Sequence, residues 1–118
     1  MKYLCLIFSE SSAWTAMSAD ERQQMSADYY TFTEEIRNSG HYLGGNPLQP
    51  VNTAASVRVR NGRPSTTDGP FAETKEQLGG YYLIEATDMD DATGVAARIP
   101  GARIGTIEVR PVAPFGND

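Results

Sequence analysis

The stretch GGYYLIEA, Gly79 to Ala86, is a run of strand-forming residues with no charged position before Glu85. A second run of the same kind, KYLCLIF, opens the chain at Lys2 to Phe8. Apolar runs this short are typical of strands that are covered on both faces. The two runs therefore predict two strands of a sheet that needs cover on both sides.

A first helix is predicted from Ser18 onward. Ser18 and Glu21 have the spacing of a capping box, in which each side chain accepts a hydrogen bond from the backbone N–H of the other residue. Apolar residues then recur at steps of four, three and four, which is one face of a helix. They are Met25, Tyr29, Phe32 and Ile36. Gly40 is expected to end this helix, because glycine adopts positive φ without strain.

A second helix is predicted to begin after Asp88, which is a favourable N-cap residue. Its apolar positions are Met89, Ala92, Ala96 and Ile99. Pro100-Gly101 is expected to stop it. A final strand, GTIEVRPV from Gly105 to Val112, follows. In this strand Ile107 and Val109 alternate with Glu108 and Arg110.

A hairpin lies between these halves of the chain. In ASVRVRNGRPSTT, Ala55 to Thr67, valines alternate with arginines as on a strand, and Asn61-Gly62 is a strong signal for a two-residue turn. We expect Ser56 to Arg60 to pair with a return arm from Arg63 to Thr67.

The order of elements is strand, helix, strand, hairpin, strand, helix, strand. It predicts a single domain, residues 1–118, with an α+β sandwich of the split β-α-β type and both helices on one sheet face. Two helices leave the other face of the apolar strands uncovered. A second copy of the chain, related by a two-fold axis, is the expected cover. The charged positions at Arg58, Arg60, Glu108 and Arg110 then face either solvent or a cavity between subunits.

The composition excludes several classes of function. The net charge of −5 argues against a nucleic-acid partner, which needs a basic surface. The N-terminal apolar run is too short for a secretory signal or a membrane span, so we expect a cytoplasmic protein with no membrane partner. A single cysteine, Cys5, permits no disulfide and no cysteine-based metal site within the chain. No nucleotide, zinc-protease or serine-hydrolase motif occurs, and no cofactor is expected.

The stretch TTDGPFAETKEQLGG, Thr66 to Gly80, has two interpretations. Asp68 before Gly69-Pro70 is turn chemistry, since the aspartate side chain can accept a backbone N–H of its own loop. Phe71 is expected to anchor that loop on the sheet. Alternatively, Asp68 acts as a base at the mouth of an apolar cavity.

The charges that follow are also open to both interpretations. Glu73 and Lys75 suit acid, base or anion-anchor roles beside a cavity, yet ETKEQ also resembles an exposed turn of helix. His41, the only histidine, is either an acid–base group or a residue that interacts favourably with the end of the preceding helix.

Three further residues are candidates. Tyr29 is a proton donor or a core residue with a hydrogen-bonded hydroxyl. Trp14 is either a lid over a pocket or a residue that packs down the loop before the first helix. Arg103, which lies in a loop between glycine and proline residues, is the cation best placed to bind an anionic substrate.

The segment TDGPFAETKEQLGGYYLIEA, together with MKYLCLIF, FTEEIRNSG, TAASVRVRNGR, AARIP and IEVRPV, resembles the DGPF subgroup of the YCII-related family. The likeness runs over nearly the whole chain. It implies a ferredoxin-like β-α-β-β-α-β fold with an inserted β-hairpin. It also implies a homodimer in which two sheets form an α+β barrel, as in muconolactone-isomerase-like proteins.

The wider family is associated with a His–Asp pair in a cleft. By the resemblance, the family histidine corresponds to Tyr29, next to Asp28, and the family aspartate falls near Thr74. This chain therefore lacks the pair as such. The family also implies lyase- or isomerase-type chemistry among relatives, and DGPF proteins resemble small companions of extracytoplasmic-function sigma factors.

Three functions remain open at this point. The first is a dimeric protein that binds a small metabolite between the sheet and the partner subunit without chemistry of its own. The second is a lyase or isomerase for a small anionic or aromatic metabolite, with a carboxylate base, a cationic anchor and an acid. The residues for these roles are Asp68 or Glu73, Arg103 or Lys75, and Tyr29 or His41. The third is a regulatory contact with another protein.

Overall fold

The computed structural model of the protein describes residues 1–114. Its elements in chain order are β1 (Lys2–Glu10), α1 (Ser11–Thr15), α2 (Ala19–Asn38), β2 (Tyr42–Pro47), η1 (Val51–Thr53), β3 (Ala55–Arg60), β4 (Arg63–Asp68), β5 (Glu76–Glu85), α3 (Met89–Ala96), η2 (Pro100–Arg103) and β6 (Thr106–Pro111), where η marks a 3-10 helix.

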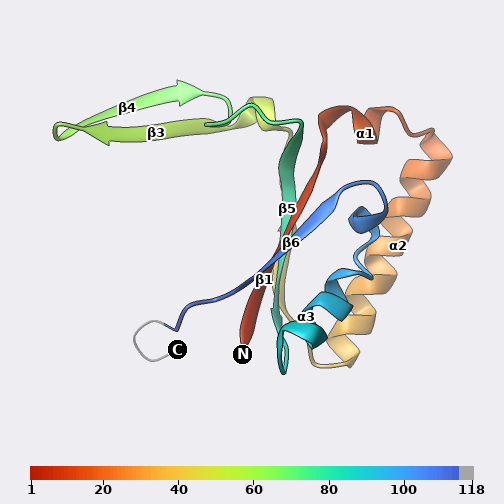
Figure 1. Ribbon diagram of the computed structural model, residues 1–118. Helices are drawn as coiled ribbons and strands as arrows, with labels where there is room; N and C mark the ends of the chain where they lie inside the picture. The colour runs from red at the N-terminus through yellow and green to blue at the C-terminus, as the bar shows by residue number, and fades with distance from the viewer. Residues whose placement is uncertain (115–118) are drawn as a thin grey trace.

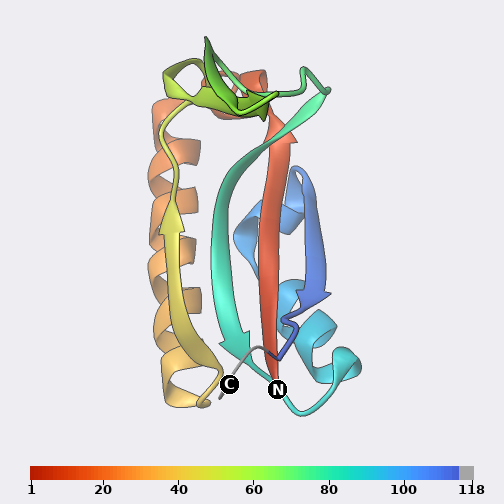
Figure 2. The ribbon, with the colours of Figure 1, turned by 90° about the vertical axis from the view of Figure 1, so that its left-hand side faces the viewer.

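Four strands form one antiparallel sheet in the order β2-β5-β1-β6. Figure 1 shows this sheet edge-on, with α2 and α3 on the same side of it. Figure 2 shows the opposite face, which no helix covers. The predicted α+β fold is therefore confirmed as a ferredoxin-like β-α-β-β-α-β arrangement, with the β3–β4 hairpin inserted between the second and third strands of the sheet.

The helix α2 forms as its sequence predicts. Ser18 Oγ accepts from the Glu21 N–H at 3.1 Å, and Glu21 Oε1 accepts from the Ser18 N–H at 2.9 Å. Gly40 has a φ of 82° and follows the last turn, as expected of a glycine at this position. The apolar stripe faces the sheet, with three residues buried and Tyr29 half-buried. The buried residues are Met25, Phe32 and Ile36.

The core lies between α2, α3 and the inner face of the sheet. Its largest fully buried side chains are Ile36, Ile84, Ile99 and Cys5. Phe32 and Tyr82 meet edge to face with ring centroids 5.3 Å apart. The core is thus formed by residues that the apolar strands and the helix stripes predicted, with Cys5 as an inert buried thiol.

The helix α3 differs from its prediction at two places. Asp88 caps it, since Asp88 Oδ1 accepts from the Asp91 N–H at 2.8 Å. However, Met89 is 39% exposed, because it is the first helical residue and its side chain leans back beyond the helix start, while Val95 is buried instead. The helix ends at Ala96, before Pro100-Gly101, and Pro100 opens the separate turn η2.

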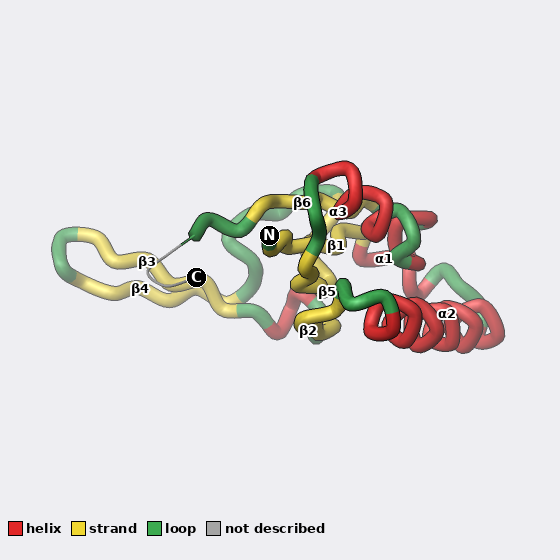
Figure 3. The backbone as a smooth tube through the Cα atoms, turned by 90° about the horizontal axis from the view of Figure 1, so that it is seen from below, coloured by secondary structure: helices red, strands yellow, loops and turns green. Residues whose placement is uncertain are grey.

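The hairpin forms as expected but stands apart from the main sheet. Its strands pair only with each other in a second, two-stranded sheet, and Asn61 and Gly62 have φ values of 53° and 75°, as a type I′ turn requires. Figures 1 and 3 show it projecting from one end of the sheet, on the side away from the helices. The radius of gyration is accordingly 16.2 Å, against about 13 Å for a compact chain of this length.

The uncovered sheet face carries apolar side chains. Strand alternation places Leu4 and Leu6 opposite the buried Tyr3 and Cys5, and the same alternation applies along β5. The half-buried apolar residues of this open face include Leu4, Leu6, Phe8, Tyr81 and Leu83. Along its edge, Glu108 and Arg110 pair with Leu6 and Leu4. The prediction that helices cover only one face is therefore confirmed.

Among residues 1–114, no helix is long and apolar enough to cross a membrane.

Candidate functional site

A cavity of about 500 Å³ lies where the hairpin joins the sheet. It is open to solvent and is lined by residues from α1, η1, the end of β4 and the loop into β5. The lining residues are Ser11, Val51, Asn52, Asp68, Gly69, Pro70, Glu73, Thr74 and Gln77. We call it the hairpin cavity. Two of the predicted site residues, Asp68 and Glu73, thus come together at one place.

The carboxylates of Asp68 and Glu73 are exposed. Within the described part of the chain, neither makes a hydrogen bond or an ion pair through its side chain. Asp68 is the last residue of β4 and is still paired with Ala55 of β3, so its side chain does not turn back onto the loop. Main-chain contacts hold the turn instead, since the Gly69 N–H donates to Ala54 O at 2.7 Å. The interpretation of Asp68 as a loop-capping acceptor is therefore wrong.

The loop between Phe71 and Glu76 is held by Gln77. Its Nε2 donates to Ala72 O at 3.1 Å and to Thr74 O at 3.0 Å, and Thr74 Oγ1 donates to Glu76 O at 2.6 Å. The segment is therefore an irregular loop, held by side-chain hydrogen bonds to its own carbonyls, that leads into β5. The alternative of an exposed helical turn is wrong. Sequence reasoning did not single out Gln77, because a glutamine side chain that bonds several carbonyls of one loop leaves no periodic signal.

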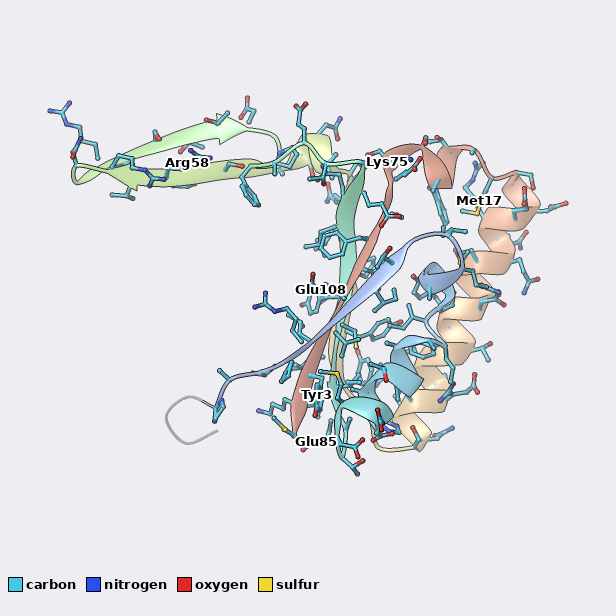
Figure 4. The ribbon with its side chains drawn as sticks, viewed as in Figure 1. Tyr3, Met17, Arg58, Lys75, Glu85 and Glu108 are labelled. Atoms are coloured by element: carbon cyan, nitrogen blue, oxygen red, sulfur yellow. The ribbon has the colours of Figure 1, made fainter. Side chains whose placement is uncertain are left out.

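Phe71 and Lys75 do not line the hairpin cavity. Phe71 is 81% exposed, so it does not anchor the loop on the sheet of its own chain. Lys75 Nζ lies 3.4 Å from Glu10 Oε1 with 84% of its side chain exposed. Figure 4 shows Lys75 at this end of the sheet.

Tyr29 and Arg103 meet in a second place, between α2 and η2. Arg103 Nη2 donates to Asp28 Oδ2 at 2.8 Å, and Tyr29 Oη accepts from the Gly101 N–H at 3.1 Å. The hydrogen bond from Arg103, followed by one from Gln24, lowers the pKa of Asp28, while burial raises the pKa of Tyr29. The charge of Arg103 is therefore balanced by Asp28. Together, the contacts of Arg103 and Tyr29 hold η2 against α2.

A small cleft of about 290 Å³ lies beside these contacts. It is lined by Asp28, Thr31, Phe32, Glu35, Ala97, Arg98, Ile99, Pro100 and Arg103. Both of its arginines are paired with a carboxylate, since Arg98 Nη2 lies 3.4 Å from Glu35 Oε2. An anion in this cleft would therefore find no lining arginine that is free of a carboxylate partner.

His41 lies at the opposite end of the sheet from the hairpin cavity. Its Nε2 is 3.1 Å from Asp91 Oδ1, and its Nδ1 is 2.7 Å from Ser39 Oγ. The chain Ser39–His41–Asp91 has the composition of a hydrolase triad. However, the backbone N–H groups of residues 39 to 41 all donate to carbonyls of α2, so none is available to stabilise an oxyanion. The arrangement links the end of α2 to the start of α3.

Trp14 lies in α1, a short helix where the sequence indicated a loop, and it is half-exposed. It lines neither of the two cavities. The candidate residues therefore occupy separate places. Asp68 and Glu73 share the hairpin cavity, Tyr29 and Arg103 share the α2–η2 junction, and His41 stands alone. No cluster of three or more potential metal ligands occurs among residues 1–114.

Comparisons with known proteins agree with this fold. A family model, YCII-related domain, matches residues 1–116. An uncharacterised protein of Rhizobium meliloti (strain 1021) is 35% identical over 117 residues, which is 98% of this chain and 94% of the relative. These matches reach the wider family, and membership of the DGPF subgroup stays a prediction.

A solved structure has the same fold at low sequence identity. It is a 5-chloro-2-hydroxyhydroquinone dehydrochlorinase from Burkholderia phenoliruptrix AC1100 in complex with 2,5-dihydroxybenzoquinone. The TM-score is 0.57 with 13% identity, and the match covers 96% of this chain and 94% of the other. At this identity the likeness shows the fold alone.

Proposed function

Because the chain belongs to the YCII-related family, we propose that it binds a small hydroxylated ring compound in the hairpin cavity. One observation carries the proposal, namely that Asp68 and Glu73 both line this cavity and have no partner among the described residues. Ionised carboxylates accept hydrogen bonds only, so they suit a ligand with several O–H donors. The hydroxyl groups of a phenol or a sugar-like ring meet that requirement.

The rest of the cavity supports the same ligand class. Val51 and Pro70 offer apolar surface for a ring, while Asn52 and Thr74 offer further polar atoms. A volume of about 500 Å³ lies in the range that binds small molecules. A small anion is a poor fit here, since two carboxylates and no lysine, arginine or histidine line the cavity. We therefore favour a neutral ligand over the anionic metabolite that the sequence allowed.

We further propose that the protein acts as a homodimer. The open face of the sheet carries several half-buried apolar side chains, and no helix among residues 1–114 covers them. A second copy placed face to face removes this surface from water at the usual spacing of about 10 Å between packed sheets. The hairpin cavity lies at the rim of that face, so the second subunit narrows its mouth.

The ligand proposal is tested by titrating the protein with hydroquinone, a neutral ring with two hydroxyl donors, and following backbone amide shifts by NMR. We expect saturable shifts at the residues lining the hairpin cavity. Asp68→Asn and Glu73→Gln should each weaken the apparent affinity about tenfold, in line with the loss of one charged hydrogen-bond partner. Glu34→Gln, on the exposed side of α2, is the control. The proposal would be contradicted if the amide shifts were confined to other surfaces, or if all variants bound hydroquinone with the same affinity.

A lyase or isomerase is the second candidate for the same cavity. It is favoured by the free carboxylates together with the fold shared with a dehydrochlorinase. In such a reaction, Asp68 or Glu73 takes a proton from the substrate, the released electron pair forms a new double bond, and a leaving group departs with its bonding pair. Incubation with 5-chloro-2-hydroxyhydroquinone should then release chloride, and Asp68→Asn combined with Glu73→Gln should abolish that release. If the compound binds but no chloride is released, the binding function is supported and the lyase function is ruled out for this substrate.

A further inference from the structure

The β3–β4 hairpin is an arm that pairs with no other strand among residues 1–114. Its two strands bond only to each other, and it projects from one end of the sheet on the side of the open face (Figures 1 and 3). Val57 is 63% exposed and Val59 is 57% exposed. An isolated two-stranded ribbon is marginally stable in water, and exposed valines on it add a further cost. The arm therefore requires a surface to pack on.

The two faces of the arm differ in chemistry. The register pairs Val57 with Thr66 and Val59 with Pro64, so one face is largely apolar. It pairs Arg58 with Ser65 and Arg60 with Arg63, so the other face carries three arginines. Figure 4 shows Arg58 on the arm. No carboxylate occurs between Ala55 and Thr67. The arm is thus an amphipathic, basic ribbon.

The rest of the chain has the complementary charge. The net charge of −5 includes the three arginines of the arm, so the remainder carries a net charge of −8. Carboxylates gather at both ends of the sheet. At the hairpin end they are Glu73 and Glu76, beside Glu10, which is paired with Lys75. At the other end they are Asp88 and Asp90, beside Glu85, which is paired with the N-terminal amine. A second copy presents an acidic end to the arm in either orientation.

The length of the arm brings it to that second copy. Six residues of strand span about 20 Å, whereas two sheets that pack face to face lie about 10 Å apart. An arm that projects on the side of the open face therefore passes beyond the sheet of a subunit seated on that face. It must then lie against one end of that subunit.

We propose that the β3–β4 arm is a clasp that grips the second copy of the chain. The apolar face with Val57 and Val59 packs on the end of the partner, and the long arginine side chains of the other face reach round the edges of the ribbon to carboxylates beside that contact. The inference rests on the proposed homodimer and adds the element that holds it together. It also explains why Phe71, at the base of the arm, is exposed in the single chain.

The test compares dimer dissociation constants by sedimentation equilibrium. One variant carries Val57→Asp with Val59→Asp, and another carries Arg58→Glu with Arg60→Glu. Tyr30→Glu, on the exposed side of α2, is the matched control because it also replaces an exposed apolar residue with a carboxylate. We expect each arm variant to raise the dissociation constant at least tenfold and the control to leave it within about twofold. Since the arm is a separate sheet, circular dichroism should show the body still folded.

The outcomes separate the clasp from the dimer. If the wild-type protein is a dimer and both arm variants have the dissociation constant of the control, the clasp proposal is wrong and the dimer proposal stands. If the wild-type protein is a monomer, both are wrong, while the hydroquinone titration still decides the ligand proposal. A photocrosslinking residue, Val59→p-benzoylphenylalanine, gives a second readout. Adducts of twice the chain mass support the clasp, and adducts only within one chain overturn it.

Discussion

Cys5 shows how burial controls the chemistry of a single side chain. Its sulfur is fully buried in β1, and desolvation raises the pKa of the thiol to about 11. At pH 8 the reactive thiolate is then about one part in a thousand of the native protein. We predict that Ellman's reagent labels Cys5 only at the rate of unfolding, and at once in denaturant. Labelling of the native protein within the mixing time would contradict this.

Asp91 predicts a pH dependence of stability. The hydrogen bond from the Thr87 N–H, followed by that from His41, lowers the pKa of this carboxyl. A folded pKa below the unfolded one stabilises the protein above about pH 4, and this contribution is lost as pH falls through the folded pKa. Asp91→Asn should therefore lower Tm at pH 7 and have less effect below pH 3.

The control for this prediction is Asp90→Asn, in the same first turn of α3 but without a side-chain partner in the described part of the chain. It should change Tm less than Asp91→Asn at pH 7. Equal effects of the two variants, or an Asp91→Asn effect that persists unchanged into acid, would show that the Thr87 and His41 contacts do not stabilise the fold.

Residue roles were predictable from sequence only where the partner is near in the chain. The Ser18–Glu21 box and the Asp88 cap follow from a spacing of three residues. The carboxylate partner of His41 lies 50 residues away, and that of Arg103 lies 75 residues away. No local pattern marks such pairs, so both residues looked like free candidates for a site until the fold placed a carboxylate beside each of them.

At the scale of elements, we predict opposite changes in stability when each of two glycines is replaced by alanine. A Cβ on Gly105, just before β6, would overlap the carbonyl oxygen of Phe8 in β1. Gly94 lies in α3 with nothing within 4 Å of a Cβ. Gly105→Ala should destabilise the fold by about 2 kcal/mol, because the β1–β6 pairing has to shift. Gly94→Ala should stabilise it by about 0.5 to 1 kcal/mol, as for alanine in a helix interior.

Urea unfolding of the two variants and the wild-type protein provides the measurement. The two free energies should move in opposite directions from the wild-type value. A tolerated Gly105→Ala would mean that β6 does not pack against β1 as closely as the structure has it.

Elements were predictable from sequence because their signals are local and strong. The Asn61-Gly62 turn fixed the register of β3 and β4, and the stripe on α2 fixed its buried face. The loop into β5 was not predictable, since Gln77 shapes it through contacts to carbonyls. The direction of the arm was equally hidden, because the turn sequence specifies pairing within a hairpin and not its angle to the main sheet.

At the scale of the whole molecule, we propose that the chain is one half of a homodimer. It has helices on one side of its sheet, apolar side chains on the other, and an arm that extends beyond the body. The apolar runs in β1 and β5 predicted that a second covering layer is needed. They did not predict the hairpin cavity, which exists only because the arm leaves the sheet at the point where Asp68 and Glu73 meet.

The most direct test of the central claim is the molar mass in solution, measured by light scattering over a range of micromolar concentrations. If a second copy covers the open face of the sheet, the mass should approach twice the 12.9 kDa of the chain as concentration rises. A mass that stays at 12.9 kDa throughout would contradict the covered face and, with it, the clasp.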